Sequence, residues 1–401
     1  MRRFHPEERV LVSEVAEAPE SEISGTTVQH NFSRLVRPAL LLMLGVAVVS
    51  CAKTQAPSPS AAAPSPTEGV PQGMFATYPP DGSSCTPTVA SHQAPSDTKS
   101  RPGMVWVPGG EFSMGSNDHQ FADARPWHRV RLSGYWIAKT TVTNDQFARF
   151  VRATHYVTVA ERKPSQKDFP DAPPENLVPG SLVFTPPSHP VELNDDTQWW
   201  RYVPGANWRH PDGPGSTIDG KGDYPVVQMA FEDAQAYAKW AGKRLPTEAE
   251  FEYAERGGLS CMRYAWGSEF TPNGKDMANT FHGRFPNAST APHNHPTTTP
   301  VASYKPNGYG LYDMSGNVWE WTSDWFRSDY YRQLAAAGGV AIDPKGPKDS
   351  WDVNEPGVPK HSMRGGSFLC TNQFCSRYEV GGRGQGEPSS SANHIGFRLA
   401  E

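Results

Sequence analysis

Regular patterns of apolar and polar residues begin near Gly103. Residues 104–114 (MVWVPGGEFSM) alternate between apolar and polar positions and turn at Pro108-Gly109-Gly110. An alternation of period two is typical of a strand with one buried face, so this stretch predicts a β-hairpin. Residues 128–137 predict another strand.

Helical spacing occurs at three places, each with a start or stop signal. The first is a capping box of Thr143 with Gln146, followed by Phe147, Phe150 and Val151 on one face. The second is a stripe of Ala234, Ala238 and Ala241 that ends at Gly242. The third is a capping box of Thr247 with Glu250 at the start of a helix over residues 248–256. After Gly258 the pattern predicts turns and short strands. Two or three helices in so irregular a chain exclude doubly wound and barrel folds.

The longest apolar run, residues 38–49, lies near the N-terminus. Twelve residues are too few to span a bilayer comfortably. Arg34 and Arg37 precede the run and Ser50-Cys51 follows it, which is the layout of an export signal. Residues 48–51 (VVSC) resemble a bacterial lipoprotein processing box, so we expect Cys51 to carry a lipid. A short buried helix is the alternative, and the acidic residues 14–22 suggest that the true start lies further downstream.

Composition then divides the chain into three parts. Residues 1–51 contain the export signal, and residues 52–100, rich in Pro, Ser and Ala, predict a disordered spacer. Residues 101–401 predict one folded domain. The 12 Trp, 14 Tyr and 18 Phe can build its core, while 36 Gly and 39 Pro exclude long helical bundles. The net charge of −5 argues against nucleic-acid binding, and five Cys are too few for a disulfide scaffold.

The most informative residues are two cysteines in residues 367–377 (SFLCTNQFCSR). Cys370 and Cys375 cannot share a helix face, but a strand leading into a tight loop can bring their sulfurs together. Such a pair can form a structural disulfide, act as a redox pair or bind a soft metal ion such as Cu(I). Zinc would need two more ligands at a suitable spacing, and none is evident nearby.

Several segments together resemble the formylglycine-generating enzyme family, also called sulfatase-modifying factors. They are residues 104–115 (MVWVPGGEFSMG), 203–211 (VPGANWRHP), 240–250 (WAGKRLPTEAE), 307–321 (NGYGLYDMSGNVWEW), 364–367 (RGGS) and 396–398 (GFR). The resemblance covers essentially all of residues 103–401. It implies an α+β fold related to C-type lectins, with little regular secondary structure.

The resemblance also implies a reaction. Aerobic family members carry two cysteines at the positions of Cys370 and Cys375 and resemble copper oxidases in which the pair holds Cu(I). They use O2 to remove a Cβ hydrogen from a cysteine in an unfolded sulfatase segment, Cys-x-Pro-x-Arg, and so make Cα-formylglycine. Cys375 is also a candidate for exchange with the substrate thiol. Ser367 is expected to orient O2 or that thiol, and a strand serine bonded to backbone is the alternative.

Further site residues follow from the same resemblance. Trp199, Trp200, Trp208 and Arg377 match positions that line or support the substrate cleft, although each Trp could simply be core. His394 stands at the cleft edge, where the family commonly has an amide. Positions that carry disulfides in secretory-pathway members hold Ala238, Glu255, Val380 and Leu399. Cys85 and Cys261 remain, and they could pair in an oxidising compartment.

Two calcium sites are implied as well. Asp313, Gly316, Val318 and Glu320 match the first one, with oxygen ligands that suit Ca²⁺; a capped turn under Trp319 and Trp321 is the alternative. The second would begin at Asn279 and Thr280. There His293-Asn294-His295 stands where the family has a carboxylate and then a carbonyl, so we expect this site to be lost, weakened or rebuilt around Asn294. The two histidines could bind a transition metal, but histidines on a loop are usually just solvated.

The sequence thus predicts an exported, lipid-anchored, monomeric oxidase that touches the membrane only through its anchor. A non-catalytic lipoprotein that uses the same fold to bind a partner is the main alternative. A non-haem iron enzyme similar to the sulfoxide synthases of ergothioneine synthesis is a weaker one. Those enzymes add an N-terminal helical domain with histidine ligands, whereas residues 52–100 carry only His92.

Overall fold

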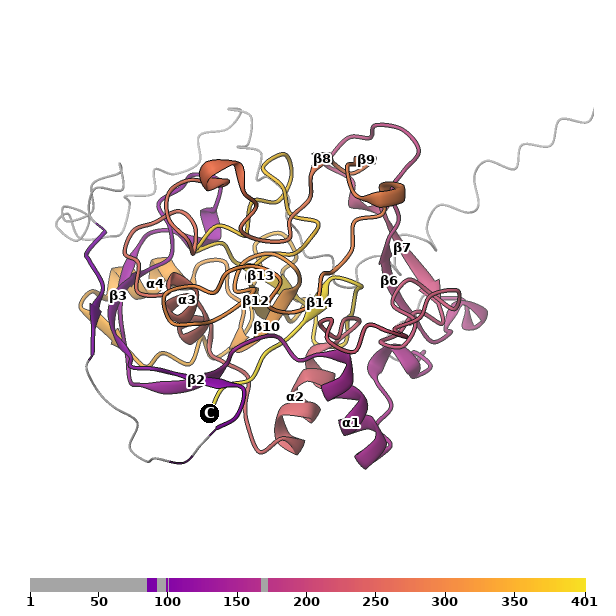
Figure 1. Cartoon of the computed structure of the whole chain (residues 1–401), viewed down its shortest axis with the longest axis horizontal. Helices are drawn as coiled ribbons and strands as arrows, with labels where there is room; N and C mark the ends of the chain where they lie inside the picture. The colour runs from indigo at the N-terminus through magenta and orange to yellow at the C-terminus, as the bar shows by residue number, and fades with distance from the viewer. Residues whose placement is uncertain (1–84, 92–98, 100, 167–171) are drawn as a thin grey trace, which may run out of the picture. The chain divides into compact units, whose positions relative to one another are not determined.

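Short strands and four α-helices lie among long stretches of irregular backbone in the described part of the chain. The computed structural model describes residues 85–91, 99, 101–166 and 172–401 (Figure 1). The predicted export signal and Cys51 lie outside the described residues. The α-helices are α1 (Asn144–Thr154), α2 (Phe231–Trp240), α3 (Glu248–Arg256) and α4 (Tyr330–Ala337). The α+β class with little regular structure is confirmed.

The strands form two four-stranded sheets and three two-stranded pairs. The first sheet has the order β1-β3-β4-β11 and the second β13-β12-β10-β14, while β2-β5, β6-β7 and β8-β9 are pairs. The strands are β1 (Val89–Ala90), β2 (Met104–Val107), β3 (Gly110–Met114), β4 (His128–Leu132), β5 (Tyr135–Ala138), β6 (Gly180–Phe184), β7 (Trp200–Pro204), β8 (Gly283–Arg284), β9 (Ala288–Ser289), β10 (Trp319–Trp325), β11 (Val340–Ile342), β12 (His361–Arg364), β13 (Gly384–Gly386) and β14 (Ile395–Gly396).

The predicted hairpin over residues 104–114 is wrong in its pairing. β2 and β3 do form on either side of the Pro108–Gly110 turn, but β2 pairs with β5 and β3 pairs with β4. The single strand predicted over residues 128–137 is likewise two strands, β4 and β5. Local alternation predicts that a segment is extended, whereas the choice of partner depends on contacts distant in sequence.

The three predicted helices are confirmed, and α4 was not predicted. The capping boxes at Thr143 and Thr247 both form, and α3 has the predicted bounds. Each such N-cap is worth about 1 kcal/mol. α4 begins after Asp329, whose side chain forms no cap hydrogen bond.

Helix α3 is buried along its whole length, although six of its nine residues are charged or hydroxyl-bearing aromatic. Glu248 accepts from Arg383, and Glu252 accepts from Arg256 and Arg364 at 2.6 Å. Arg364 ends β12 and Arg383 precedes β13, so these ion pairs join α3 to the second sheet. Charges that are buried this deeply must be paired, because an unpaired one costs several kcal/mol.

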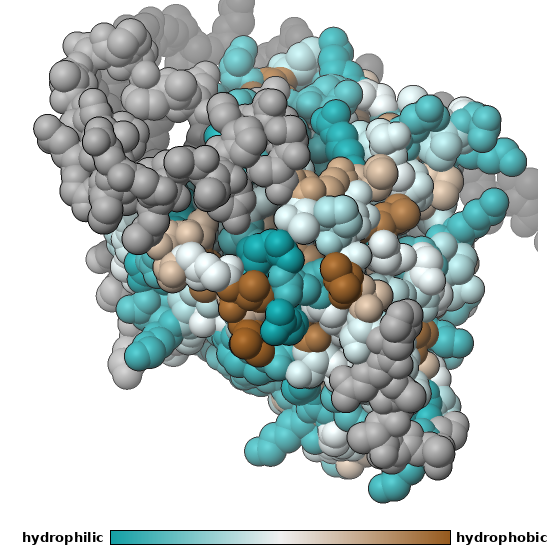
Figure 2. Space-filling view, turned by 90° about the vertical axis from the view of Figure 1, so that its left-hand side faces the viewer, coloured by the Kyte–Doolittle hydropathy of each residue, from teal (hydrophilic) through white to brown (hydrophobic). Residues whose placement is uncertain are grey.

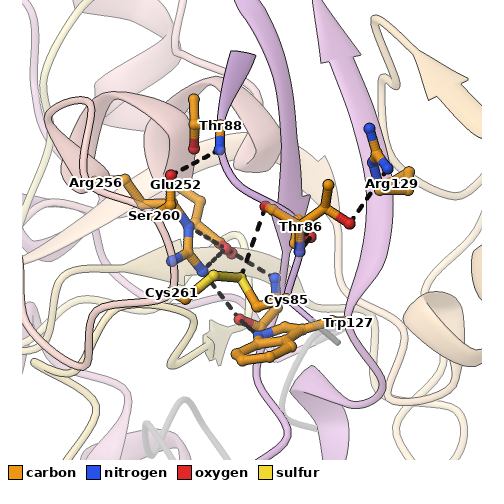
Figure 3. Close-up of a disulfide and its surroundings, with 11 residues drawn as sticks. Cys85, Thr86, Thr88, Trp127, Arg129, Glu252, Arg256, Ser260 and Cys261 are labelled. Atoms are coloured by element: carbon orange, nitrogen blue, oxygen red, sulfur yellow. Dashed lines mark hydrogen bonds and ion pairs between the residues drawn. A yellow bond between two sulfur atoms is a disulfide. The ribbon is translucent and has the colours of Figure 1, made fainter. Parts of the chain in front are cut away.

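A disulfide joins Cys85 to Cys261 across 176 residues of sequence (Figure 3). It fixes residues 85–91, which fall inside the predicted disordered spacer, against the first sheet. There Val89 pairs with Glu111, Thr86 N–H donates to Ser113 Oγ at 3.1 Å, and Thr88 N–H donates to Ser260 Oγ at 2.6 Å. The spacer prediction therefore fails for these seven residues, because a long-range bond holds them.

The outer face of the first sheet combines apolar edges with charged residues between them. Val89 and Ile342, on the two edge strands, are 64% and 66% exposed. Glu111 forms ion pairs with Arg129 and Arg131 on the strands between. Figure 2 shows the side on which β3 lies in Figure 1, and its hydrophobic areas are separated by hydrophilic ones. Among the described residues, no helix is both long and apolar enough to cross a bilayer.

Removing the disulfide should destabilise the domain and release its first strand. Cys85→Ser and Cys261→Ser, singly or together, should each lower the free energy of unfolding by about 2–4 kcal/mol, because the unfolded chain regains the freedom of a long loop. Denaturant unfolding measures the loss, and limited proteolysis detects the released residues 85–91. Wild-type stability and protease resistance in both single variants would contradict this role for the bridge.

The buried carboxyl of Glu255 should make stability depend on pH. Burial raises its pKa to about 8 from 4.5, although nearby Arg364 opposes the shift. The folded state therefore keeps the proton between pH 4.5 and 8, where the unfolded state releases it, and stability falls as pH rises through this window. Glu255→Gln, which can still accept from the Ser315 hydroxyl, should match wild type near pH 4.5 and exceed it above pH 8.

Thermal unfolding at about pH 4.5 and about pH 9 measures this difference. Glu252→Gln is the matched control on the same helix. Burial raises the pKa of Glu252, but Arg256 and Arg364 outweigh burial and hold that pKa below its usual value. Its neutral variant should therefore lose about 3–5 kcal/mol near neutral pH by leaving buried guanidinium groups uncompensated. Parallel pH profiles for Glu255→Gln and wild type would refute the assignment.

Candidate active site

A sharp turn after β12 brings the thiol-bearing segment against the rest of the domain. Gly366 has a φ of +70°, and a Cβ at this position would lie 2.8 Å from the Tyr378 backbone nitrogen. Glycine alone accepts both this conformation and this close approach without strain. The next residue, Ser367, opens a tight turn in which the Cys370 N–H donates to the Ser367 carbonyl at 2.9 Å.

The sulfur atoms of Cys370 and Cys375 lie 2.6 Å apart. The segment between them folds back on itself, since Thr371 and Cys375 form an antiparallel bridge. The two residues are only 1% and 3% exposed. Both side chains are thiols in this structure and are not joined by a disulfide. The loop thus brings the two thiols together as the spacing of the cysteines suggested it could.

Aromatic rings surround this pair. Phe374, next to Cys375, stacks parallel on Phe285 with ring centroids 5.0 Å apart, and its edge meets Trp199 at 5.2 Å. Trp199 is fully buried and belongs to the same core cluster as both cysteines. No sequence pattern marked either Phe as a site residue. Phe285 comes from a distant segment, and Phe374 lies inside the thiol loop. They add buried apolar surface beside the loop that carries the thiols.

Ser367 and His394 form a polar contact within this apolar surrounding. Ser367 Oγ lies 3.3 Å from His394 Nδ1 and accepts from the Leu369 N–H at 3.2 Å. The Ser367 N–H donates to the Cys370 sulfur at 3.4 Å. His394 is 4% exposed, and burial lowers its pKa to about 3, so the ring is neutral. It is buried rather than at an exposed cleft edge.

The remaining predicted substrate residues divide into two groups. Trp199 and Trp200 meet the site, since Trp200 packs its ring on His394 at 4.7 Å. Trp208 instead packs against Phe147 of α1 and under the Arg209 guanidinium, which fits the core alternative. Arg377 donates to the Asp123 carboxylate and to the Arg383 carbonyl. These bonds tie the segment after Cys375 to the residues before β4.

The first predicted calcium loop is held together by an arginine. Both carboxylate oxygens of buried Glu320 accept from Arg398 at 2.7 Å, and the same guanidinium donates to the Tyr312 and Asp313 carbonyls. The Asp313 side chain accepts from the Ala302 N–H at 2.7 Å. Each carboxylate oxygen can accept more than one bond, so the oxygen donors fit Ca²⁺ chemically while Arg398 already balances the charge of Glu320.

The loops of the two predicted calcium sites touch each other. Asn279 O accepts from the Asn317 N–H at 2.8 Å, and a Cβ at Gly316 would meet Asn279 O at 2.5 Å. The Asn279 side chain donates to Asn317 and to Thr297, and the Thr280 hydroxyl is 3.4 Å from the His282 ring. Asn279 thus serves a loop-to-loop contact, whereas the Thr280 hydroxyl stays within its own loop.

The histidine loop offers no replacement ligands to this second site. His293 and His295 are exposed, and His295 lies 3.9 Å from Asp212. The Asn294 side chain accepts from the Ser289 N–H and donates to the Asn287 carbonyl, so it braces its own loop. Throughout the described residues, no three His, Cys, Asp or Glu side chains are grouped so as to hold a metal ion.

The donor set at Cys370 and Cys375 fits a soft cation of low coordination number. Two buried thiols suit Cu(I), whereas zinc takes four ligands. The sulfurs would have to move apart to hold an ion between them. The fold and the site together define a class of protein. It is an α+β domain with few regular elements that carries a buried dithiol on a tight turn.

The family follows from comparison with known proteins. The model of the sulfatase-modifying factor enzyme 1-like domain matches residues 90–401, and the chain belongs to this family. The formylglycine-generating enzyme of Streptomyces coelicolor is 45% identical over 321 residues, which cover 79% of this chain and 94% of that protein. The resemblance stated from the sequence motifs is therefore confirmed.

Two further matches are less similar in sequence. The structure of PvdO from Pseudomonas aeruginosa is 23% identical with a TM-score of 0.47, covering 75% of this chain and 99% of that one. The mouse protein named inactive C-alpha-formylglycine-generating enzyme 2 is 34% identical over 307 residues, covering 75% of this chain and 85% of that protein. Because this mouse relative is named inactive, membership alone leaves the chemistry to be argued from the site.

The distance between the sulfurs predicts that a mild oxidant will bridge them. Treating the folded protein with diamide should join Cys370 to Cys375, because little movement separates them from bonding distance. Alkylation after unfolding, followed by peptide mass mapping, would detect the bridged peptide, and dithiothreitol should reverse it. Cys375→Ser serves as the control that cannot bridge. If both thiols can still be fully alkylated after the diamide treatment, the short distance between the sulfurs is contradicted.

Proposed function

We propose that this protein oxidises a cysteine in an unfolded sulfatase segment, Cys-x-Pro-x-Arg, to Cα-formylglycine with O2 and Cu(I). The observation that carries the proposal is the buried pair of sulfurs, 2.6 Å apart, on the Ser367–Cys375 turn. The name of the Streptomyces relative, a formylglycine-generating enzyme at 45% identity, supports it. Cys370 and Cys375 are the residues that would hold the metal.

The reaction has to balance in atoms and electrons. The substrate side chain, a thiol-bearing methylene, reacts with one O2 and two molecules of a thiol reductant. The products are the aldehyde, one hydrogen sulfide, one water and the disulfide of the reductant. O2 takes four electrons, two from the substrate side chain and two from the reductant. Cu(I) held by two thiolates supplies the one-electron chemistry that O2 needs to react with the substrate thiol.

The residues of the chain set the conditions for this reaction. The Ser367 N–H, 3.4 Å from the Cys370 sulfur, favours the thiolate because a donated hydrogen bond stabilises negative charge. The burial of both cysteines limits access of bulk water to the sulfurs, which favours a soft ion over a hydrated hard one. The Ser367 hydroxyl is the polar group available to orient O2 or the substrate thiol. Cys375 is also suited to exchange with that thiol.

Substrate binding in this proposal uses the aromatic side of the site. Trp200 would form the apolar wall for the extended peptide, with fully buried Trp199 supporting it and His394 packed against its ring. Arg377 is bound to Asp123 and would support the loop rather than contact the peptide directly. Trp208 would support the wall from the core. An added extended strand is a common way to bind an unfolded segment.

Calcium at Asp313, Gly316, Val318 and Glu320 is part of the proposal as a structural ion. The carboxylates of Asp313 and Glu320 and the backbone carbonyls between them are the hard oxygen donors that Ca²⁺ prefers. We do not extend this proposal to Asn279 and Thr280, because the Asn279 side chain bonds to a neighbouring loop and the Thr280 hydroxyl lies beside His282 of its own loop.

Export is proposed as well. The Cys85–Cys261 disulfide supports it, because disulfides persist in oxidising compartments and are rare in the cytosol. A lipid on Cys51 would anchor the protein to a membrane facing the periplasm or the cell exterior. The protein would meet its sulfatase there as a monomer, with copper and O2 available.

The direct test uses the reduced full chain loaded with Cu(I). A peptide carrying Cys-x-Pro-x-Arg is incubated in air with dithiothreitol, and mass spectrometry follows the conversion of the cysteine side chain to the aldehyde. We expect conversion by the wild type and at least about a hundredfold loss in Cys370→Ser and Cys375→Ser, because metal-ligand changes of this kind remove the metal. The Cys85→Ser, Cys261→Ser double variant is the matched control and should keep the activity.

Each outcome separates the proposed functions. Conversion that requires Cys370 and Cys375 but not Cys85 and Cys261 supports the oxidase. Tight Cu(I) binding without conversion would leave the metal site standing and reject the sulfatase substrate. If the chain neither binds Cu(I) nor converts the peptide, the result favours the non-catalytic lipoprotein. The mouse relative that is named inactive is an example of such a family member.

A further inference from the structure

His394 is fixed in place by contacts from three directions. Its Nδ1 lies 3.3 Å from Ser367 Oγ, and its ring packs edge-on against Trp200 at 4.7 Å. Its backbone carbonyl accepts from the Trp319 N–H at 2.9 Å, which ties it to strand β10. The histidine therefore presents one ring nitrogen to the turn that carries the thiols, and it has little freedom to turn away.

Ser367 connects this histidine to Cys370. The hydroxyl oxygen accepts from the Leu369 N–H, and in the tautomer of His394 that carries its proton on Nε2 the hydroxyl hydrogen is donated to Nδ1. Both bonds together select one rotamer of Ser367 and hold the turn closed. In the closed turn, the Ser367 N–H points at the Cys370 sulfur, 3.4 Å away.

A neutral ring suits this role. Burial keeps the pKa of His394 far below the physiological range, so Nδ1 can accept a hydrogen bond at any working pH. The ring adds no positive charge beside the thiols. An apolar residue of similar size could fill the same space against Trp200, but it could not accept the hydroxyl hydrogen.

We infer that His394 is a positioning residue which, through Ser367, holds the N–H that stabilises the Cys370 sulfur in its reduced, metal-binding form. The part of this inference that concerns Cu(I) rests on the proposed function; the part that concerns the thiols does not. Groups that support metal ligands from behind typically change metal affinity by about 10- to 100-fold when they are removed.

The first test needs neither metal nor substrate. The dithiol–disulfide equilibrium of Cys370 and Cys375 is measured on the full chain in dithiothreitol redox buffers by alkylation and peptide mass mapping. His394→Leu should shift it about tenfold toward the disulfide, or about 30 mV, because reduced sulfur loses its hydrogen-bond donor. His394→Asn, whose amide can still accept from Ser367, should stay close to wild type.

His128→Leu is the matched control. His128 is also buried, at 2% exposure, and also packs edge-on against an aromatic ring, that of Tyr331 at 4.6 Å. Tyr331 belongs to the other core cluster, which does not contain the cysteines. Its replacement should lower stability in a similar way and leave the thiol equilibrium unchanged. A purely structural role for His394 would make the two Leu variants behave alike.

The second test is competition for Cu(I) between the reduced chain and a chromophoric chelator. His394→Leu should bind about 10- to 100-fold more weakly than wild type, with His394→Asn restoring the affinity. A folded His394→Leu variant with the wild-type thiol equilibrium and affinity overturns the inference. Should that variant fail to fold, Ser367→Ala, which opens no large cavity, must reproduce the shift, and a wild-type equilibrium there overturns it too.

Failure of the proposed function remains distinguishable from failure of this inference. A wild-type chain that binds no Cu(I) and converts no peptide rejects the oxidase. The metal-free equilibrium still decides whether His394 supports the thiols, since it depends only on the two sulfurs and the turn that holds them.

Discussion

The requirement that buried charges be paired organises this domain. Helix α3 carries the carboxylates of Glu248 and Glu252 into the interior, where no water can solvate them. Their partners, Arg364 and Arg383, lie more than a hundred residues later in the chain. A charge left alone in this interior would cost several kcal/mol, so α3 can dock in only one way against the second sheet. Few regular elements are needed when a small number of such pairs sets the arrangement.

The same pairs hold the site from both ends. Arg364 ends β12 immediately before the glycine turn into Ser367, and Arg383 follows the segment that leaves Cys375. Arg377, bound to Asp123, braces that segment as well. The loop with the two thiols is therefore short and tied down on either side by charged groups, while its own surroundings are aromatic. Ion pairs thus hold the two ends of a loop whose cysteines lie in the apolar core.

The disulfide adds a second long-range constraint near this frame. Cys261 is followed by Arg263, which binds Glu379 in a bidentate ion pair at 2.7 and 2.8 Å, and the Val380 N–H donates to the Arg263 carbonyl. Arg263 thus connects the disulfide at the surface to the loop that follows Cys375. The two cysteine pairs have different environments: one closes a surface strand, and the other lies within the core.

The sequence by itself determined what depends on neighbours along the chain. Capping boxes predicted α1 and α3, and the ordered motifs indicated the family and directed attention to Cys370 and Cys375. Only the tertiary structure decided what depends on distant partners: that β2 pairs with β5, that Cys85 reaches Cys261, and that Phe285 stacks on Phe374 of the thiol loop. His394 shows the limit most clearly. Its residue type is visible in the sequence, but its contact with Ser367 exists only because β14 lies beside β10, and such pairings are set by the whole core rather than by local pattern.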